Sequence, residues 1–100
     1  MSFQRWDYEF DGTYINPNSL KEEAGVYVIW CNTGNTWKIL DVGESDNVVS
    51  RILHHDRADC WEQNCDGTIH YSATYISNQQ ERRDLENRIR SREQVICGEE

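Results

Sequence analysis

The chain has 100 residues, of which 37% are hydrophobic and 28% are charged, a composition typical of one globular domain rather than of a disordered segment. Ten basic against eighteen acidic residues give a formal net charge of −8. This charge disfavours non-specific nucleic acid binding without excluding it. No apolar run approaches the roughly 20 residues needed to cross a bilayer, and the N-terminal residues lack the layout of a signal peptide. We therefore expect a cytoplasmic protein.

Basic residues are concentrated in the second half of the chain. Residues 1–50 carry three basic and eight acidic side chains, and residues 51–100 carry seven and ten. All seven basic residues of the second half are arginines, and five of them lie between Arg82 and Arg92. A basic ridge on an acidic body would keep nucleic acid as a partner.

The four cysteines do not form a recognisable motif. No pair has the Cys-x-x-Cys spacing of a zinc knuckle or a redox site, and nothing in the sequence indicates secretion. We therefore expect free thiols, buried or partly buried, at Cys31, Cys60, Cys65 and Cys97. The alternative is a zinc site in which Cys60 and Cys65 are joined by one of the histidines His54, His55 and His70.

The first half of the chain predicts an arm followed by a hairpin. Residues 1–24 are polar and rich in turn residues, and we interpret them as an arm that packs on the domain through its aromatic side chains. Residues 25–31 are rich in β-branched and aromatic side chains and predict a strand. Residues 32–36 have the composition of a hairpin loop, so residues 37–42 predict an antiparallel returning strand.

A helix follows the hairpin. Residues 45–55 have apolar side chains at helical spacing, and Ser45 or Asp46 can cap the start of this helix. Residues 56–67 are polar, end in a turn signal and predict a connection without regular structure.

The last part of the chain predicts a strand and a helix. Residues 68–76 alternate β-forming side chains, and Ser77 or Asn78 can cap a final helix that runs to about Glu93. The resulting order is β-β-α-β-α. It predicts an α+β fold with a small three-stranded antiparallel sheet flanked by helices.

Four short motifs occur in a characteristic order. Gly25-Val26-Tyr27 opens the first predicted strand, and Asp41-Val42-Gly43 follows at the end of the second. Arg51 and His55 lie four residues apart on the next helix, and Glu86 lies in the last helix. Together these motifs resemble the GIY-YIG nuclease superfamily.

The resemblance extends over most of the chain and implies both a fold and an activity. It covers residues 25–98, where it implies a GIY-YIG-like domain with residues 1–24 as an added arm. It also implies a metal-dependent endonuclease that hydrolyses phosphodiester bonds.

One position departs from the family pattern. The second motif of the family opens with a tyrosine that helps to place the attacking water or the phosphate, and this chain has Asp41 there. A carboxylate removes a hydroxyl donor and adds negative charge opposite a negative phosphate. Asp41 is therefore either a metal ligand or base, or a sign of attenuated cleavage.

The candidate site residues have the chemistry that such a reaction requires. Hydrolysis of a phosphodiester needs an activated water, neutralised phosphate charge and usually a divalent metal. Tyr27 is the candidate base, and with an ordinary pKa of about 10 it needs a nearby cation. Arg51 can supply that charge and bind a phosphate bidentately. His55 shares its helical face, and Glu86 offers the hard oxygen ligand that Mg²⁺ or Mn²⁺ prefers.

Two further residues complete the expected site. Gly43 and Ser45, at and just beyond the end of the second strand, are assigned with Arg51 to substrate binding. We expect Tyr27 and Asp41 to lie on adjacent antiparallel strands, with Arg51 and Glu86 facing the same concavity.

Each of these side chains also has a structural interpretation. Tyr27 can be a core aromatic residue, and His54 is as available as His55. Arg51 can pair with an acidic neighbour, Asp46 or Glu44. Glu86 can form an ordinary i,i+4 ion pair with an arginine, Arg82 or Arg90.

Nucleic acid, with DNA as the first choice, is the expected substrate. A homodimer or a protein partner would supply specificity, because the sequence predicts no second DNA-binding module. The alternative to a nuclease is a catalytically attenuated GIY-YIG-like module that binds nucleic acid or a protein partner.

Overall fold

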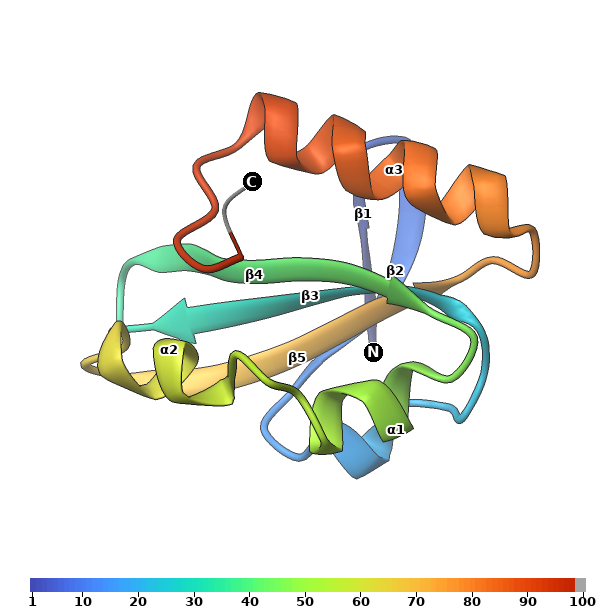
Figure 1. Ribbon diagram of the computed structural model, residues 1–100. Coiled ribbons are helices and arrows are strands. Elements are labelled where there is room, and N and C mark those ends of the chain that lie inside the picture. The colour runs from blue at the N-terminus through green and yellow to red at the C-terminus, as the bar shows by residue number, and fades with distance from the viewer. Residues whose placement is uncertain (99–100) are drawn as a thin grey trace.

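A five-stranded antiparallel sheet forms the centre of the computed structural model, which describes residues 1–98. Its strands are ordered β1-β2-β5-β3-β4, and each neighbouring pair is antiparallel (Figure 1). The strands are β1 (Ser2–Arg5), β2 (Tyr8–Tyr14), β3 (Gly25–Asn32), β4 (Trp37–Ser45) and β5 (Thr68–Tyr75).

The expectation of a three-stranded sheet is therefore wrong, although the α+β class holds. The predicted strands correspond to β3, β4 and β5, and the segment interpreted as an arm adds β1 and β2. The turn between the added strands explains the error. Trp6 and Asp7 form a two-residue hairpin loop in which both φ angles are positive, 52° and 70°. Such turns usually contain Asn-Gly or Gly-Gly, so Trp-Asp carries no turn signal.

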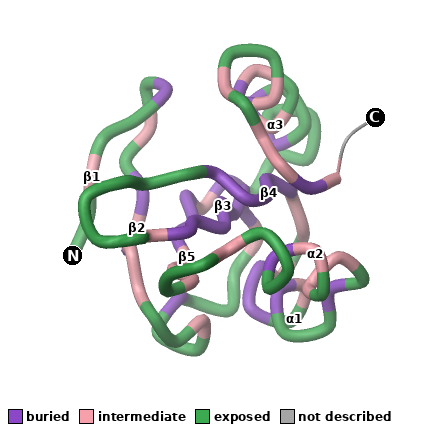
Figure 2. The backbone as a smooth tube through the Cα atoms, turned by 90° about the vertical axis from the view of Figure 1, so that its left-hand side faces the viewer, coloured by how far each residue is buried: buried purple, intermediate pink, exposed green. Residues whose placement is uncertain are grey.

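The central strand β3 is buried on both faces, and it separates two layers of core. Tyr27, Ile29 and Cys31 belong to one buried cluster, and the intervening Val28 and Trp30 belong to the other. Figure 2 shows β3 as a buried trace in the interior of the molecule. A strand covered on both faces reads as a continuous apolar run, which is why this strand was predicted correctly.

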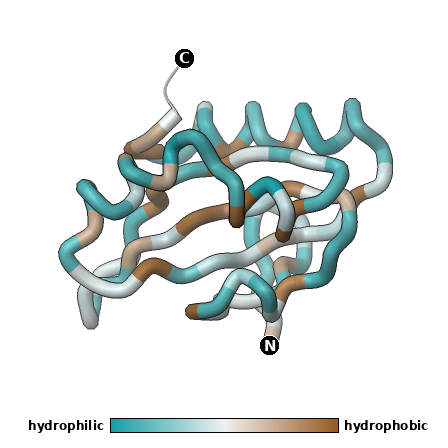
Figure 3. Tube along the Cα trace, turned by 60° about the horizontal axis from the view of Figure 1, so that its bottom comes forward, coloured by the Kyte–Doolittle hydropathy of each residue, from teal (hydrophilic) through white to brown (hydrophobic). Residues whose placement is uncertain are grey.

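Helices cover both faces of the sheet. The 3₁₀ helix η1 (Pro17–Ser19), α1 (Val48–Leu53) and α2 (Ala58–Gln63) lie on the face of Tyr27, and α3 (Gln79–Arg92) lies on the opposite face (Figure 1). The helix α3 is confirmed close to its expected limits and is hydrophilic along most of its length (Figure 3).

The two short helices differ from the sequence expectation. Helix α1 begins after Asn47, whose side chain accepts a hydrogen bond from the backbone N–H of Ser50, because β4 continues through Ser45. Helix α2 lies inside the stretch expected to be a polar connection. It is anchored by Trp61, of which only 3% is exposed. Its apolar residues Ala58, Cys60 and Trp61 lie within four positions, and six residues are too few to show a helical periodicity.

All four cysteines are paired in two disulfides, Cys31–Cys65 and Cys60–Cys97. The expectation of free thiols is therefore wrong, and the alternative zinc site loses its two thiolates. The paired cysteines are 34 and 37 residues apart, and their partners are set by the fold rather than by local spacing. Both bonds attach the α2 region to other parts of the chain.

The helices of residues 1–98 include none that is long and apolar enough to cross a membrane.

Candidate functional site

Gly43 allows the side chain of Tyr27 to cross the edge strand. Tyr27 pairs with Gly43 in the β3–β4 ladder. A Cβ atom at position 43 would overlap the Tyr27 hydroxyl and ring. The glycine that closes the second motif is thus required by the tyrosine of the first motif, which gives their joint occurrence a physical reason.

The Tyr27 hydroxyl is paired with a histidine from the segment after α1. Its oxygen lies 2.7 Å from Nε2 of His55, and both residues are buried. The backbone N–H of Arg57 donates to the other ring nitrogen, Nδ1, at 3.0 Å. The neutral ring therefore carries its proton on Nε2 and donates it to Tyr27. Asp56 lies 3.4 Å from Nδ1, but that nitrogen has no proton to share in this tautomer.

The environment keeps both members of this pair neutral. Burial, followed by the charge of Arg51, lowers the pKa of His55 to about 4. Burial, followed by the charge of Asp41, raises the pKa of Tyr27 to about 12, while Arg51 and Arg57 oppose this rise. At pH 7 Tyr27 is thus a phenol that accepts from His55 and has its own proton to donate.

Arg51 is close enough to the pair for its charge to lower the pKa of both Tyr27 and His55, and 38% of its side chain is exposed. Its guanidinium donates to Asp56 at 3.0 Å, so neither acidic neighbour considered from the sequence is its partner. The histidines also separate clearly. His54 is exposed and contacts the carbonyl of Ser50, whereas His55 is the one that meets Tyr27.

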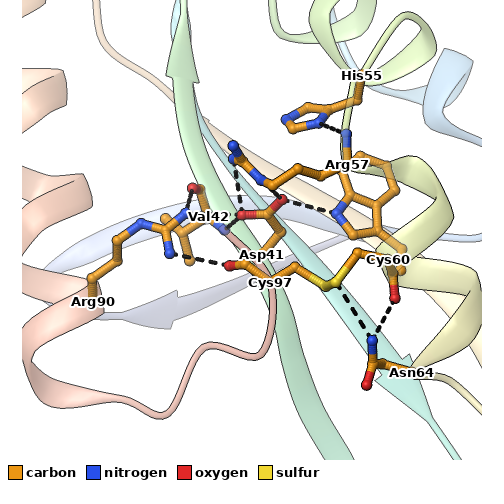
Figure 4. The surroundings of a disulfide bond; sticks show 9 residues. Asp41, Val42, His55, Arg57, Cys60, Asn64, Arg90 and Cys97 are labelled. Carbon is orange, nitrogen blue, oxygen red and sulfur yellow. Dashed lines mark hydrogen bonds and ion pairs between the residues drawn. A yellow bond between two sulfur atoms is a disulfide. The ribbon is translucent and has the colours of Figure 1, made fainter. Parts of the chain in front are cut away.

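Asp41 is completely buried and its carboxylate is surrounded by donors (Figure 4). Arg57 donates through two nitrogens at 2.8 and 3.2 Å. Arg90 donates at 2.9 Å, and Trp61 donates its indole N–H at 2.8 Å. The backbone N–H of Val42 adds a further bond at 2.9 Å. This carboxylate has no free lone pair aimed at a ligand, so it acts as an anchor rather than as a metal ligand or base.

The anchor is connected to the Tyr27–His55 pair. Asp41 holds the side chain of Arg57, and the backbone of the same arginine fixes the ring of His55. A chain of contacts therefore runs from Asp41 through Arg57 and His55 to Tyr27. The charge of Arg57 also lowers the pKa of Tyr27.

Glu86 comes from the other face of the sheet. It lies on α3, whereas Tyr27, Arg51 and His55 lie on the face of α1 and α2. Its carboxylate pairs with Arg90 at 3.4 Å, and Arg90 reaches across β4 to Asp41. The expected single concavity therefore holds three of these residues. Glu86 is linked to it through Arg90 and is close enough for its charge to raise the pKa of Tyr27. Burial raises the pKa of Glu86.

Ser45 takes part in the turn before α1. Its hydroxyl accepts from the backbone N–H of Asn47 at 3.0 Å and lies 3.1 Å from the carbonyl of the same residue. Gly43 contributes space rather than a donor. Both residues shape the end of the strand, and their expected part in substrate binding stays a prediction.

Of the two candidate carboxylates, Asp41 and Glu86, one could coordinate the divalent metal that the resemblance implies. Within residues 1–98, no group of three His, Cys, Asp or Glu side chains gathers to hold an ion. The side chain of Glu86 is 24% exposed, and its carboxylate lies 3.4 Å from Arg90. Mg²⁺ accepts one protein carboxylate when waters and phosphate oxygens fill its remaining positions. Glu86 therefore fits such an ion, and Asp41 does not.

Sequence reasoning missed three residues that organise the site: Arg57, Trp61 and Arg90. Each donates a hydrogen bond to Asp41, and they lie 16, 20 and 49 residues from it in the sequence, respectively. A lone arginine or tryptophan outside any motif gives no local signal of such a contact.

No family model, no curated protein and no solved structure matches this chain. The resemblance to the GIY-YIG superfamily thus remains a prediction that its motifs alone carry.

Proposed function

We propose that this chain is a metal-dependent endonuclease of the GIY-YIG type that hydrolyses phosphodiester bonds in nucleic acid. The single observation that supports the proposal best is the buried Tyr27–His55 pair. Its ring orientation is fixed by the backbone of Arg57, and Arg51 lies beside it. A tyrosine oxygen held by a neutral histidine next to an arginine matches the demands of activating water beside a phosphate.

In this proposal each residue of the pair has a defined part. Arg51 binds the scissile phosphate through its guanidinium. The phenolate of Tyr27 takes a proton from the attacking water, and the Nε2–H of His55 and the charges of Arg51 and Arg57 stabilise that phenolate. Glu86 is the residue that would hold the metal ion. When bound, the ion neutralises charge on the phosphate oxygens.

The high pKa and the burial of Tyr27 predict slow turnover. A Tyr27 pKa of about 12 leaves very little phenolate at pH 7. Tyr27 is also only 1% exposed, so surrounding side chains must open before a phosphate can reach it. Binding of the natural substrate, with a cation or through its own contacts, must therefore both lower the pKa of Tyr27 and open the side chains that cover it.

Cleavage of labelled DNA and RNA, single- and double-stranded, with Mg²⁺ or Mn²⁺ and with a chelator, tests the proposal. We expect metal-dependent nicking that falls by about a hundredfold or more in Arg51→Ala, because an oriented charge on the transition state is lost. Lys21→Ala removes an exposed basic side chain outside both the Tyr27 site and the arginines of α3, so it is the matched control and should cleave as the natural chain does. Absence of cleavage on every substrate, with the fold intact, would overturn the proposal.

A second candidate is a GIY-YIG-like module that binds nucleic acid or a protein partner without cleaving. The observation that favours it is Asp41, which replaces the family tyrosine and is fully occupied by arginine and tryptophan donors. Binding of an oligonucleotide without cleavage, in the assay above, would support this candidate. Specificity in either case would come from a homodimer or a protein partner.

The two disulfides indicate the redox environment in which the protein is found. Disulfides persist in oxidising compartments and are rare in the cytosol. With all four cysteines paired, we propose a non-reducing setting in place of the expected cytoplasmic one. Thiol counting on protein isolated under alkylating conditions tests this, and four alkylated cysteines would contradict it.

A further inference from the structure

A second candidate site lies on the sheet face opposite to Tyr27. Two clefts of about 470 and 370 Å³ share Arg5, Trp30 and Trp37 in their walls. Volumes of this size suit small ligands or single nucleotide units. The β3–β4 hairpin extends toward β1 in Figure 2, and the smaller cleft is lined by residues of both, including Phe3 and Trp37.

The clefts are built around stacked indole rings. Trp30 is 5% exposed and stacks on Trp6, with ring centroids 6.3 Å apart and planes 20° from parallel. Trp37 packs edge-on against Trp30 at 6.1 Å and against His70 at 4.9 Å. Even so, 46% of Trp37 is exposed. The ring of Trp37 is therefore fixed by its contacts with Trp30 and His70 and remains accessible to solvent.

Cations surround these rings on an otherwise acidic protein. The guanidinium of Arg5 lies 4.8 Å from the ring centroid of Trp6 and 5.7 Å from that of Trp30. Lys38 lines the larger cleft beside Arg5. Among the described residues that line this cleft, one has a carboxylate, Glu93, which accepts from Trp6 at 3.0 Å and lies 3.5 Å from Arg5. The cleft therefore has a net positive charge, in contrast to the −8 of the whole chain.

We infer that these clefts bind a single-stranded segment of nucleic acid, with a base stacked on Trp37 and its phosphates against Arg5 and Lys38. Aromatic faces and neighbouring cations are the two elements of single-strand binding that do not depend on base sequence. The choice of this ligand rests on the proposed function. The binding itself requires no residue of the Tyr27 site.

Binding of a fluorescein-labelled oligothymidylate of about 12 nucleotides, followed by anisotropy in the presence of EDTA, tests the inference. EDTA keeps the strand intact during the measurement. Trp37→Ala should weaken binding about tenfold, as expected for loss of one stacked base, and Trp37→Phe should retain most of the affinity. Ile15→Ala is the matched control, since it removes another exposed apolar side chain, 67% exposed, and should leave binding unchanged. Affinity should also fall as salt is added.

The outcomes separate this inference from the proposed function. Equal oligonucleotide affinity in Trp37→Ala and the natural chain would overturn the inference, even if the protein cleaves. Tight binding that is insensitive to salt, or that a double strand shares equally, would also overturn it. Trp37-dependent binding by a chain that never cleaves would support the inference and contradict the nuclease.

Discussion

The hydroxyl of Tyr27 lies 2.7 Å from Nε2 of His55, and it reaches this position by passing over the one residue of β4 that has no side chain, Gly43. This contact brings together the first, second and third motifs of the sequence. It also determines how the site should respond to mutation and to pH.

Gly43→Ala should disrupt the site and destabilise the protein. The new methyl group would overlap the Tyr27 ring, which must shift within a packed core. Such overpacking costs about 1–3 kcal/mol of unfolding free energy. Urea denaturation measures this loss. Gly34→Ala is a useful contrast, because a Cβ there meets nothing within 4 Å, although its φ of +97° adds some strain of its own.

His55 should make stability depend on pH below neutrality. Its pKa is about 4 in the folded protein and about 6.5 when unfolded. The unfolded chain therefore binds a proton first, and stability falls as the pH decreases from about 6.5 to about 4. We expect a loss of about 2–3 kcal/mol across this window.

Replacing His55 tests the assignment of this loss. His55→Gln has no ionisable ring and should flatten the pH dependence of the unfolding free energy between about pH 4 and 6.5. His54→Gln, at the exposed neighbour, should keep it. An unchanged profile in His55→Gln would show that other groups carry the dependence.

Asp41→Asn should be strongly destabilising. The change removes the negative charge that compensates the half-buried Arg57 and the mostly buried Arg90. Loss of one partner from a buried ion pair typically costs about 3–5 kcal/mol. Thermal or urea unfolding measures it. A near-neutral effect would mean that Asp41 is not the anchor described here and would reopen a direct role in catalysis.

The disulfide Cys60–Cys97 should stabilise the site region. It attaches α2 to the segment after α3, beside Asp41 and Arg57 (Figure 4). A bond closing a loop of 37 residues contributes about 4 kcal/mol in the chain-entropy model. The double variant Cys60→Ala/Cys97→Ala should lose about this amount in urea denaturation. An unchanged midpoint would contradict the contribution.

The parts of the fold that were predictable are those with local patterns. The apolar run of β3, the short hairpin to β4 and the capped helix α3 each have their cause within a few neighbouring residues. The β1–β2 hairpin does not, because the positive φ angles of Trp6 and Asp7 are held by packing of Trp6 on Trp30. Tertiary contacts override the weak local preference there.

The site residues likewise divide into those that a local sequence pattern predicts and those that tertiary contacts determine. The motif spacing predicted Tyr27 on a strand beside Gly43, and it predicted the helical placement of Arg51. The motif spacing could not predict that the Asp41 carboxylate is fully hydrogen-bonded. Its side-chain donors come from α2, from α3 and from the loop at Arg57. Such contacts depend on how the helices pack, which no local spacing records.

The pH dependence of single-turnover cleavage tests most directly whether Tyr27 supplies the base for phosphodiester cleavage. With a pKa of about 12, the rate should rise about tenfold per pH unit between about pH 7 and 9. Tyr27→Phe should abolish cleavage while oligonucleotide binding remains close to that of the natural chain. The unfolding free energy should fall by about 1–3 kcal/mol, because the buried Nε2–H of His55 loses its acceptor. Cleavage that persists in Tyr27→Phe, or a rate that is flat with pH, would contradict the role of Tyr27 as the base.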